Sequence, residues 1–478
     1  MSKTADEDQI KDRLEQLRCH FTWKLPIEDS ELIDLESRVF DEIEFLDTKF
    51  NVGIYHLLAY VRHLKGQNKE ALESLKEAED LLQPENAGQA DVRRLVTWGN
   101  YAWLYYHMGR PAEAQIYLDK VEHTCKKFAS ASCYAVECPE MDCEEGWALL
   151  KCGRKGSKQA KACFAKALEA EPENPEFNTG YAIIAYRLDK LNQTAEVPGA
   201  LSLDPLKRAV QLNPEDSYIK VLLALKLQDV GQEAEGEKYI EEALKNTCSQ
   251  AYVFRYAAMF YRRKGSRDKS LQFLKMALQA TPSSAFLHHQ IGICYRSQII
   301  EIKKAANWQP RGRGRENINR IARLAIFHFE FALEQKPTFE IVYINLADMY
   351  IEIGNCIKAE ELYQKALHMK SLEEEKLQEI YLYYGQFQEY QKKSEVDAII
   401  YYLKAIKIEK PLFARNKSIS ALEKLVSKKL QRNASDMESL SILGLLHKLK
   451  GEMNQALECY ERALRLAADS ENSVGHSP

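Results

Sequence analysis

Proline and glycine are scarce in this chain of 478 residues, which contains 14 prolines and 21 glycines. Both residue types interrupt helices, and no long window alternates apolar and polar residues with the period of two that marks a half-buried strand. The chain also lacks an apolar run of about 18 residues, the length that a membrane-spanning helix needs. Its polar, acidic start, Met-Ser-Lys-Thr-Ala-Asp-Glu-Asp, is unlike a secretory signal. We therefore expect an all-helical, cytoplasmic protein.

Cysteine pairs with metal-binding spacing are missing as well. The 11 cysteines include no Cys-x-x-Cys pair, and the densest group, Cys133, Cys138 and Cys143, is spaced more widely than structural zinc sites usually are. We expect reduced, mostly buried thiols and no metal. No Ser-His-Asp set stands out, and the segment 153–158 lacks the spacing of a phosphate-binding loop. These observations argue against an enzyme and against a bound cofactor.

The formal net charge of −4 conceals an asymmetry along the chain. Residues 251–330 contain 15 Lys and Arg but four Asp and Glu, a net charge of +11, so the rest of the chain carries −15. A basic third within an acidic protein indicates one polyanionic ligand held at one place, although a solvated basic face would give the same count.

A repeat of about 34 residues organises the chain. Tetratricopeptide units place small, aromatic and alanine residues at fixed positions, and residues 340–373 fit this pattern closely. Other units are stretched, and the one at 285–339 is split by an insert, 307–317, that contains Pro310-Arg-Gly-Arg-Gly-Arg315. We predict an all-α tetratricopeptide-repeat superhelical solenoid in several subdomains, with a central basic groove lined by the first helix of each pair.

One helical face stands apart from the repeat pattern. Trp147, Leu150 and Lys151 are spaced i, i+3 and i+4, so they share one side of a helix. A cation beside Trp and Leu is costly unless something negative meets it. We interpret this face as a pocket for the 5′ end of an RNA, with a flat group against Trp147 and a phosphate against Lys151.

Other side chains are spaced to join this pocket. Arg187 shares a face with Glu176, Gly180 and Ile183, and Arg38, Glu42 and Leu46 form a second stripe. Repeat register places further aromatic, basic and amide side chains inside the groove: Tyr218, Tyr252, Arg255, Met259, Arg262, His289 and Gln290. Aromatic faces stack on bases and guanidinium groups suit phosphates, so this set favours single-stranded RNA. Each residue alone has an ordinary explanation as a core residue or a surface ion-pair partner.

Five segments carry a family resemblance: Gln16-Leu-Arg-Cys-His-Phe-Thr-Trp23, Ala59-Tyr-Val-Arg-His-Leu-Lys-Gly-Gln67, Thr97-Trp-Gly-Asn-Tyr-Ala-Trp103, Glu144-Glu-Gly-Trp-Ala-Leu-Leu-Lys151 and Leu222-Leu-Ala-Leu-Lys-Leu-Gln228. With them the chain resembles, over essentially its full length, the interferon-induced proteins with tetratricopeptide repeats, and most of all the cap-binding subgroup. The resemblance implies an antiviral protein that sequesters viral RNA by a 5′-triphosphate, or by a cap lacking ribose 2′-O-methylation, and so inhibits its translation without catalysis.

The resemblance also implies roles for single residues. A first group would surround the cap guanine: Trp147, Leu46, Thr48, Glu42, Leu150, Glu176, Ile183, Asp216 and Tyr218. A second group would hold the phosphates and the first nucleotides: Arg38, Lys151, Arg187, Tyr252, Arg255, Tyr256, Arg262, His289, Gln290 and Lys336. Tyr460 and Leu464 would pair the chain with a second copy or with related family members.

The resemblance implies one division of the chain into segments. Residues 1–50 would complete the RNA pocket and 51–249 would form the N-terminal repeats. The basic middle repeats would span 250–339, further repeats 340–412, and the last repeat and tail 413–478.

Four positions depart from the subgroup. Glu42 and Asp216 stand where amides are usual, Ser157 replaces an aromatic residue, and Met259 replaces a cation. The alternative function is a protein-binding scaffold that does not bind RNA. A scaffold that clamps chaperone tails would need Lys and Asn at two groove positions. Arg255 and Met259 stand at these positions here, so the chain does not meet this requirement.

Overall fold

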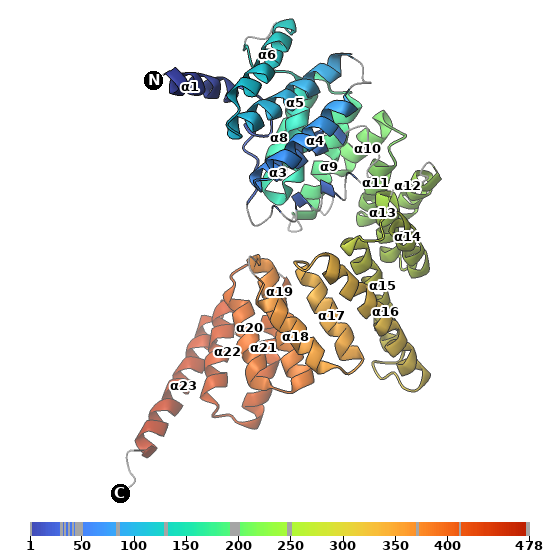
Figure 1. Ribbon diagram of the computed structural model, residues 1–478. Coiled ribbons are helices and arrows are strands. Elements are labelled where there is room, and N and C mark those ends of the chain that lie inside the picture. Colours follow the sequence, from blue (N-terminus) through green and yellow to red (C-terminus); the bar gives the residue numbers. More distant parts are fainter. Residues whose placement is uncertain are drawn as a thin grey trace. The chain divides into compact units, whose positions relative to one another are not determined.

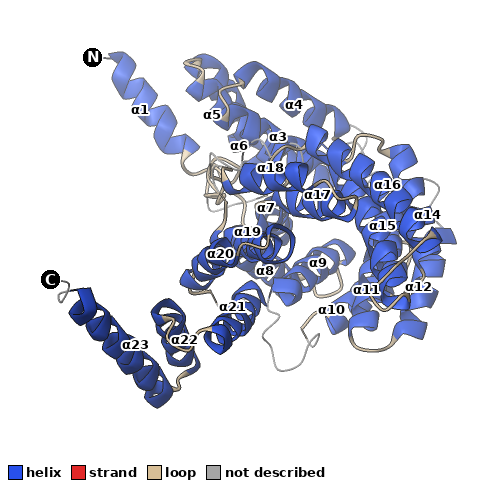
Figure 2. Cartoon of the chain, turned by 90° about the horizontal axis from the view of Figure 1, so that it is seen from below, coloured by secondary structure: helices blue, strands red, loops and turns tan. Residues whose placement is uncertain are grey.

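The computed structural model describes residues 2–28, 51–82, 87–128, 132–191, 201–245, 251–369, 372–410 and 413–474, with scattered residues from 32 to 43. Within these ranges every regular element is a helix and no strand occurs; Figure 2 shows the same by colour. Consecutive helices pack as hairpins (Figure 1). The predicted all-α tetratricopeptide-repeat solenoid is confirmed.

Contacts between residues divide the chain into two compact units, Met1–Leu287 and His288–Pro478. This boundary falls inside the segment 250–339 of the expected division. The division into five segments stays a prediction.

The first unit consists of a leading helix followed by helix hairpins. Its described helices are α1 (Ser2–Leu14), α3 (Asn51–Leu64), α4 (Asn68–Leu81), α5 (Ala87–His107), α6 (Pro111–Lys127), α7 (Pro139–Lys151), α8 (Gly153–Ala170), α9 (Pro175–Leu191), α10 (Leu203–Leu212), α11 (Ser217–Asp229), α12 (Glu233–Lys245), α13 (Ala251–Arg263) and α14 (Arg267–Ala280). One contiguous buried core runs through these pairs from Leu14 to Tyr261.

The second unit begins within a long hairpin and continues as shorter ones. It contains α15 (Ala285–Ala305), α16 (Arg313–Gln335), α17 (Glu340–Glu352), α18 (Cys356–Leu367), α19 (Glu374–Phe387), the π-helical turn η2 (Gln388–Lys392), α20 (Glu395–Lys407), α21 (Phe413–Arg432), α22 (Met437–Lys450) and α23 (Met453–Val474). The repeat predicted at 340–373 is the pair α17 and α18. The insert predicted at 307–317 forms the connection between α15 and α16 and the first turn of α16.

Local sequence explains where several helices begin and end. Side-chain oxygens of Asp216, Asn355, Ser394 and Asp436 accept hydrogen bonds from backbone N–H groups in the first turns of α11, α18, α20 and α22. At the end of α22, Gly451 adopts a left-handed φ of 81°, which only glycine adopts without cost, and the chain reverses there.

A glycine against an aromatic ring sets the distance between paired helices in the second unit. An ideal Cβ on Gly292 would lie 2.4 Å from Cε1 of Phe329, and one on Gly444 would lie 2.8 Å from Cε1 of Tyr460. Gly385 meets the ring of Tyr402 at the same separation. The rings therefore fill the space that a side chain on the first helix would occupy. A small residue that faces an aromatic one is the kind of pair that the tetratricopeptide repeat places at fixed positions.

No described helix has both the length and the apolar character needed to cross a membrane.

Within the described ranges, no three His, Cys, Asp or Glu side chains gather as a metal site would require. Burial raises the pKa of the Cys19 thiol to about 12, so this thiol stays protonated at neutral pH.

We predict that Gly292→Ala destabilises the second unit by about 1–3 kcal/mol, because the new methyl group overlaps the buried ring of Phe329. Gly314→Ala is the matched control, since it lies in the same hairpin and its Cβ would make only an ordinary van der Waals contact, 3.9 Å from Cβ of Pro310. We expect it to be neutral or to stabilise by up to about 1 kcal/mol. Urea denaturation followed by circular dichroism measures both. A Gly292→Ala protein as stable as the parent would contradict the packing.

Candidate nucleic-acid interface

The indole of Trp147 is half-buried on α7 and is held by one neighbouring ring. Its centroid lies 5.2 Å from that of Phe164 on α8, with the two planes nearly perpendicular at 78°. Phe164 is fully buried because it is wedged between two glycines: a Cβ would lie 3.1 Å from this ring at Gly146 and 2.3 Å at Gly180. The buried Phe164 ring therefore packs against the indole of Trp147 and leaves part of that side chain exposed.

Arg187 of α9 meets α7 next to this indole. Its Nη1 donates a hydrogen bond of 2.8 Å to the carbonyl oxygen of Leu150, in the last turn of α7. The last carbonyls of a helix have no partner within the helix, so a guanidinium there is favourable both as a donor and as a cation at the negative end of the helix dipole. Arg187 is thereby brought to the segment that carries Lys151, the half-buried last residue of α7. The structure thus places Arg187 against the backbone of Leu150, one turn from Trp147, and the roles of these residues at an RNA end stay predictions.

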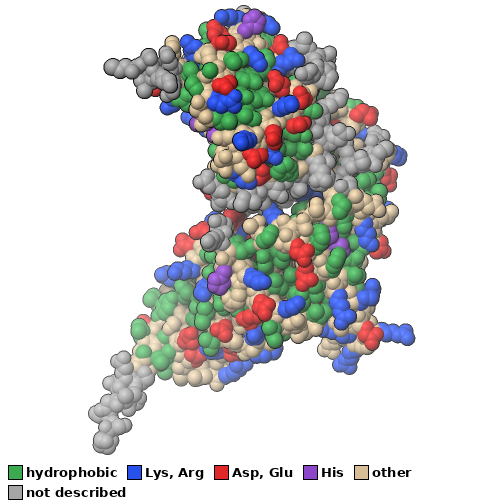
Figure 3. Space-filling model, viewed as in Figure 1, with side chains coloured by type: hydrophobic (Ala, Val, Ile, Leu, Met, Phe, Trp, Pro, Cys, Tyr) green, Lys and Arg blue, Asp and Glu red, His purple; other side chains and the backbone are tan. Residues whose placement is uncertain are grey.

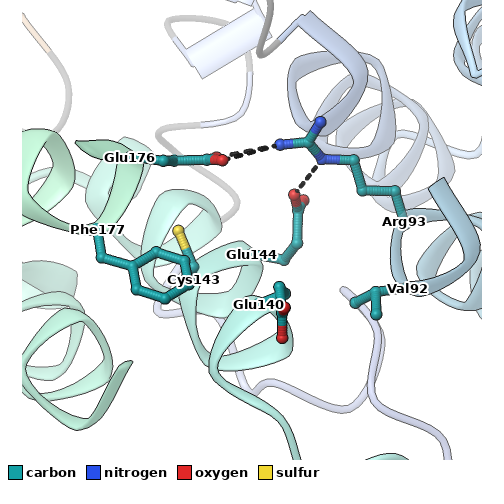
Figure 4. A pocket seen from close by; sticks show the side chains of 7 residues that line it. All are labelled: Val92, Arg93, Glu140, Cys143, Glu144, Glu176 and Phe177. Atoms are coloured by element: carbon teal, nitrogen blue, oxygen red, sulfur yellow. Dashed lines mark hydrogen bonds and ion pairs between the residues drawn. The ribbon is translucent and has the colours of Figure 1, made fainter. Parts of the chain in front are cut away.

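A buried cluster of charges lies beside this segment, around a pocket (Figure 4). Arg93 of α5 donates from Nε to Glu144 of α7 at 2.8 Å, and from Nη2 to both carboxylate oxygens of Glu176 of α9 at 3.1 and 3.2 Å. Figure 4 shows the guanidinium between the two carboxylates. One cation thus links three helices from three successive hairpins.

The charge cluster changes the acidity of Glu176. Burial raises the pKa of its carboxyl group, Arg93 opposes this rise, and the neighbouring Glu144 adds to it, with the result that the pKa lies at about 7 instead of near 4.5. The indole N–H of Trp147 also faces this carboxylate and lowers its pKa. Glu176 is therefore a hydrogen-bonding group next to the indole that changes its charge close to neutral pH.

Sequence reasoning missed Arg93, and it did not assign Glu144 a role. A signal for Glu144 existed in the spacing, because Glu140, Glu144, Trp147 and Lys151 follow at i, i+4, i+7 and i+11 and share the predicted face. Nothing in the sequence near Arg93 distinguishes it from a surface arginine.

An aromatic cluster continues the site on α11 and α13. The ring of Tyr218 lies 5.6 Å from that of Tyr256 and 6.2 Å from that of Tyr252, all as centroid distances. Burial and Tyr256 raise the pKa of the Tyr218 phenol, whereas the charge of Arg187 lowers it, so the guanidinium faces this cluster as well. Arg187 thus connects the end of α7 with the tyrosines.

Arg255 of α13 is oriented by aromatic rings. Its guanidinium carbon lies 3.6 Å from the centroid of Phe286, and 5.6 and 5.5 Å from those of Tyr252 and Tyr256. A guanidinium stacked in this way keeps its N–H edge available for an acceptor. Arg262, one to two turns further along, is half-buried.

The departures Asp216, Ser157 and Met259 each have a structural role. Asp216 caps α11 through Oδ1, which accepts from the backbone N–H of Tyr218 at 2.9 Å and of Ile219 at 3.1 Å. Burial raises the pKa of this carboxyl group and the two backbone donors oppose the rise. Ser157 is buried and donates to the Gly153 carbonyl at 2.8 Å, and Met259 packs against the core of the first unit.

The second unit holds three of the residues that were predicted to contact RNA. His289 is buried, with Nε2 3.1 Å from the amide nitrogen of Asn345 and Nδ1 3.3 Å from that of Gln290. The ring of Phe339 lies 4.9 Å from His289, and the ammonium of Lys336 lies 5.6 Å from the centroid of that same ring. These residues form one cluster around Phe339. Their convergence with the first-unit residues on one RNA stays a prediction.

Four predicted residues, Arg38, Glu42, Leu46 and Thr48, lie outside the described residues. Ile183 is buried on α9, as a wall of the pocket would be.

The predicted pairing residues lie on α23. Tyr460 is half-buried against Gly444, whereas Leu464 is 70% exposed. Leu457, which we did not predict, is 56% exposed and lies seven residues earlier on the same helix. Two leucines at i and i+7 share a face, so this spacing was the signal that could have found it.

Comparison with known proteins places these features in a family. A family model described as "Tetratricopeptide repeat" matches residues 439–473, which cover most of α22 and α23. The chain is 67% identical over 478 residues to "Antiviral innate immune response effector IFIT1" of Macaca fascicularis and 65% identical to the Homo sapiens protein of the same name. Both alignments span 100% of each chain.

Solved structures of IFIT1 are also similar to this chain. A "Human IFIT1 dimer with m7Gppp-AAAA" matches with a TM-score of 0.85 and 64% identity, and a "Human IFIT1 dimer with PPP-AAAA" with 0.82 and 63%. An "IFIT1 monomeric mutant (L457E/L464E) with Gppp-AAAA" matches with 0.86 and 65%. Each match covers 96% of this chain and 100% of the other. Full-length identity of this extent shows that the chain belongs to the family of interferon-induced proteins with tetratricopeptide repeats.

Proposed function

We propose that this chain is an antiviral effector that binds viral single-stranded RNA by its 5′ end and inhibits its translation. The preferred ends are a 5′-triphosphate and a cap that lacks ribose 2′-O-methylation. The observation that carries the proposal is the joining of a half-exposed indole, a guanidinium and a tyrosine cluster from α7, α9, α11 and α13. Human IFIT1, 65% identical, has been solved with m7Gppp-AAAA and with PPP-AAAA. The role is binding without catalysis, and it places the protein in the cytoplasm.

Each part of the site suits one part of a 5′ end. The face of Trp147 stacks on the cap guanine, and it also attracts the positive charge of a methylated guanine. Glu176 and Asp216 are carboxylates that accept hydrogen bonds from the N–H groups on the base edge. Leu46, Thr48, Leu150 and Ile183 would enclose the ring. These contacts distinguish a capped end from a triphosphate end.

The phosphates and the following nucleotides take a different set of groups. Cationic donors hold the phosphate bridge: Arg38, Lys151, Arg187, Arg255 and Arg262. An added ribose methyl on the first nucleotides would crowd Tyr252 and Tyr256. The Arg255 guanidinium, stacked on Phe286, is already oriented for a phosphate before RNA binds, which reduces the entropy that binding costs.

Pairing through α23 belongs to the same proposal. A protein of 65% identity is monomeric when leucines numbered 457 and 464 are changed to glutamate, and this chain has exposed leucines at both numbers. We propose that Leu457 and Leu464 pair the chain with a second copy or with related family members. This is also the observation that favours a protein-binding role beside RNA binding.

We predict that Trp147→Ala weakens the binding of capped RNA by roughly 5- to 150-fold, the value of one lost base stack, and changes the binding of triphosphate RNA much less. Arg187→Ala should weaken both ligands, because both contain the phosphates. Fluorescence anisotropy with matched RNAs measures the four affinities. Tyr390→Ala, which removes an exposed aromatic ring elsewhere, is the control. Equal losses of both ligands in the Trp147 variant would refute the stacking role.

The pKa of Glu176 predicts a pH dependence. Above pH 7 its carboxylate is charged and accepts from the guanine edge; below pH 7 the group takes up a proton and loses that capacity. Affinity for RNA with an unmethylated cap should therefore fall about tenfold between pH 8 and pH 6, while the bridging phosphates stay ionised. The measurement is a pH series at constant ionic strength. Glu176→Gln should bind more weakly at pH 8 and show no such slope; an unchanged slope in this variant would exclude Glu176 as its origin.

We predict that replacing Leu457 and Leu464 together by glutamate makes this chain monomeric, since two charges would then have to be buried in the pairing surface. Light scattering coupled to size exclusion measures the mass. Ile357→Glu on α18, at a residue that is 74% exposed, is the control and should leave the mass unchanged. Pairing that survives the double substitution would place the interface elsewhere.

A further inference from the structure

The α15–α16 hairpin of the second unit carries a group of cations at its tip. We use "hairpin tip" for six exposed side chains on the end of α15, the connection and the first turns of α16: Lys304, Trp308, Arg311, Arg313, Arg320 and Arg323. Figure 3 shows blue side chains gathered over this end of the hairpin. The sequence singled out this segment as an insert in the repeat, and nothing in the 5′-end site uses it.

The cations of the hairpin tip differ from the neighbouring cations that face α17, because only the latter form ion pairs with carboxylates of the protein. On the side that faces α17, Lys303 and Arg315 both form ion pairs with Glu352, and Arg296 pairs with Asp348 at 2.8 Å. At the tip, Lys304, Arg311, Arg313 and Arg323 form no ion pair within the described part of the chain, and Arg320 donates to the amide oxygen of Asn317. These five positive charges form no ion pair within the described residues, and Glu316 in the first turn of α16 is the one acidic residue of the segment 304–323.

Trp308 adds a stacking surface to these charges. Its side chain is 59% exposed, and Lys303 lies 5.7 Å from the centroid of its ring. The residue has a left-handed φ of 62°, next to Asn307 at 47°, a conformation that costs energy for a bulky side chain. Backbone hydrogen bonds from Trp308 to Lys303 and from Asn307 to Lys304 hold this turn in place. A large apolar ring is therefore presented to solvent by an ordered, strained turn.

We propose that the hairpin tip is a second RNA-binding surface, which contacts the single-stranded body of an RNA downstream of its 5′ end. Unpaired guanidinium groups contact the phosphates, and the indole of Trp308 stacks on a base irrespective of sequence. This combination of a cationic track and an aromatic ring is what sequence-independent single-strand binding requires. The inference rests on the proposed function only in that the ligand is RNA.

An anionic membrane surface would need a different tip. Membrane binding draws on buried apolar area, and Trp308 is the one exposed large apolar side chain of the tip as defined above. The exposed Leu324 and Phe327 lie further along α16. The two residues that flank Trp308 in the connection, Asn307 and Gln309, are polar. The tip therefore favours a nucleic acid over a lipid surface.

The test separates the two RNA surfaces by the choice of ligand. A 5′-hydroxyl RNA of about 40 nucleotides lacks the end group and reports on binding to the RNA body, whereas a 5′-triphosphate tetranucleotide reports on the end site alone. The full-length variant with Arg311, Arg313, Arg320 and Arg323 replaced by Gln should bind the long RNA at least tenfold more weakly. Its salt slope should shrink by about 3, at about 0.7 for each lost phosphate contact on a single strand. Its affinity for the tetranucleotide should stay within about twofold of the parent.

Two further variants sharpen the result. Trp308→Ala should weaken binding of the long RNA by about fivefold or more while keeping the salt slope, since it removes a stack and no charge. The control replaces Lys69, Lys76, Lys127 and Lys365 by Gln, four exposed lysines on α4, α6 and α18, with the same change in net charge. It should bind the long RNA as the parent does.

Several outcomes would overturn the proposal. The proposal fails if the arginine variant binds the long RNA like the parent, or if the lysine control loses as much affinity for it. It also fails if the arginine variant loses affinity only for anionic phosphatidylserine vesicles and not for the long RNA. If the parent fails to bind the tetranucleotide, the proposed function fails. If it binds the tetranucleotide but not the long RNA, the second surface alone fails.

Discussion

The buried guanidinium of Arg93 is the contact on which the candidate site of the first unit depends. It links α5 to α7 through Glu144 and to α9 through Glu176. Two neighbouring carboxylates repel each other strongly at low dielectric, and the cation between them offsets this repulsion. Removing one member of such a buried cluster usually costs about 3–5 kcal/mol, although the whole cluster adds little net stability compared with apolar packing. Its contribution is therefore positional, because α7 carries Trp147 and α9 carries Arg187.

Whether a contact could be predicted from the sequence depends on how far apart along the chain its residues lie. The repeat could be predicted because its small and aromatic positions pack within one hairpin, as Gly292 and Phe329 do. The Trp147 stripe could be predicted because it lies on one helix. Arg93 could not, since its partners follow 51 and 83 residues later, in other hairpins. That contact depends on how repeats stack on one another, and periodicity carries no information about it.

His289 and Asp216 show why a position in the repeat does not determine a role. The register placed His289 toward a groove, yet both its ring nitrogens lie next to amide nitrogens and its ring packs near Phe339. Asp216 stands where the subgroup has an amide, and its Oδ1 caps α11. Asn and Asp cap helices about equally well, so exchanging them changes the charge of the site while preserving the fold. The cap also partly compensates that charge, because two backbone N–H groups point at one carboxylate oxygen.

The excess charge of residues 251–330 divides into three kinds of cation once the structure is known. Some are neutralised inside the protein, as Arg263 is by Asp229 and Arg296 by Asp348. Arg255 is held by aromatic rings, and a cation fixed in this way discriminates between ligands because it requires an acceptor at one position. Exposed cations such as those of the hairpin tip act mainly through the field they produce, which accelerates association and makes it depend on salt. A count of charges along a sequence gives their sum, whereas selectivity and association rate depend on which of them the fold has already ordered.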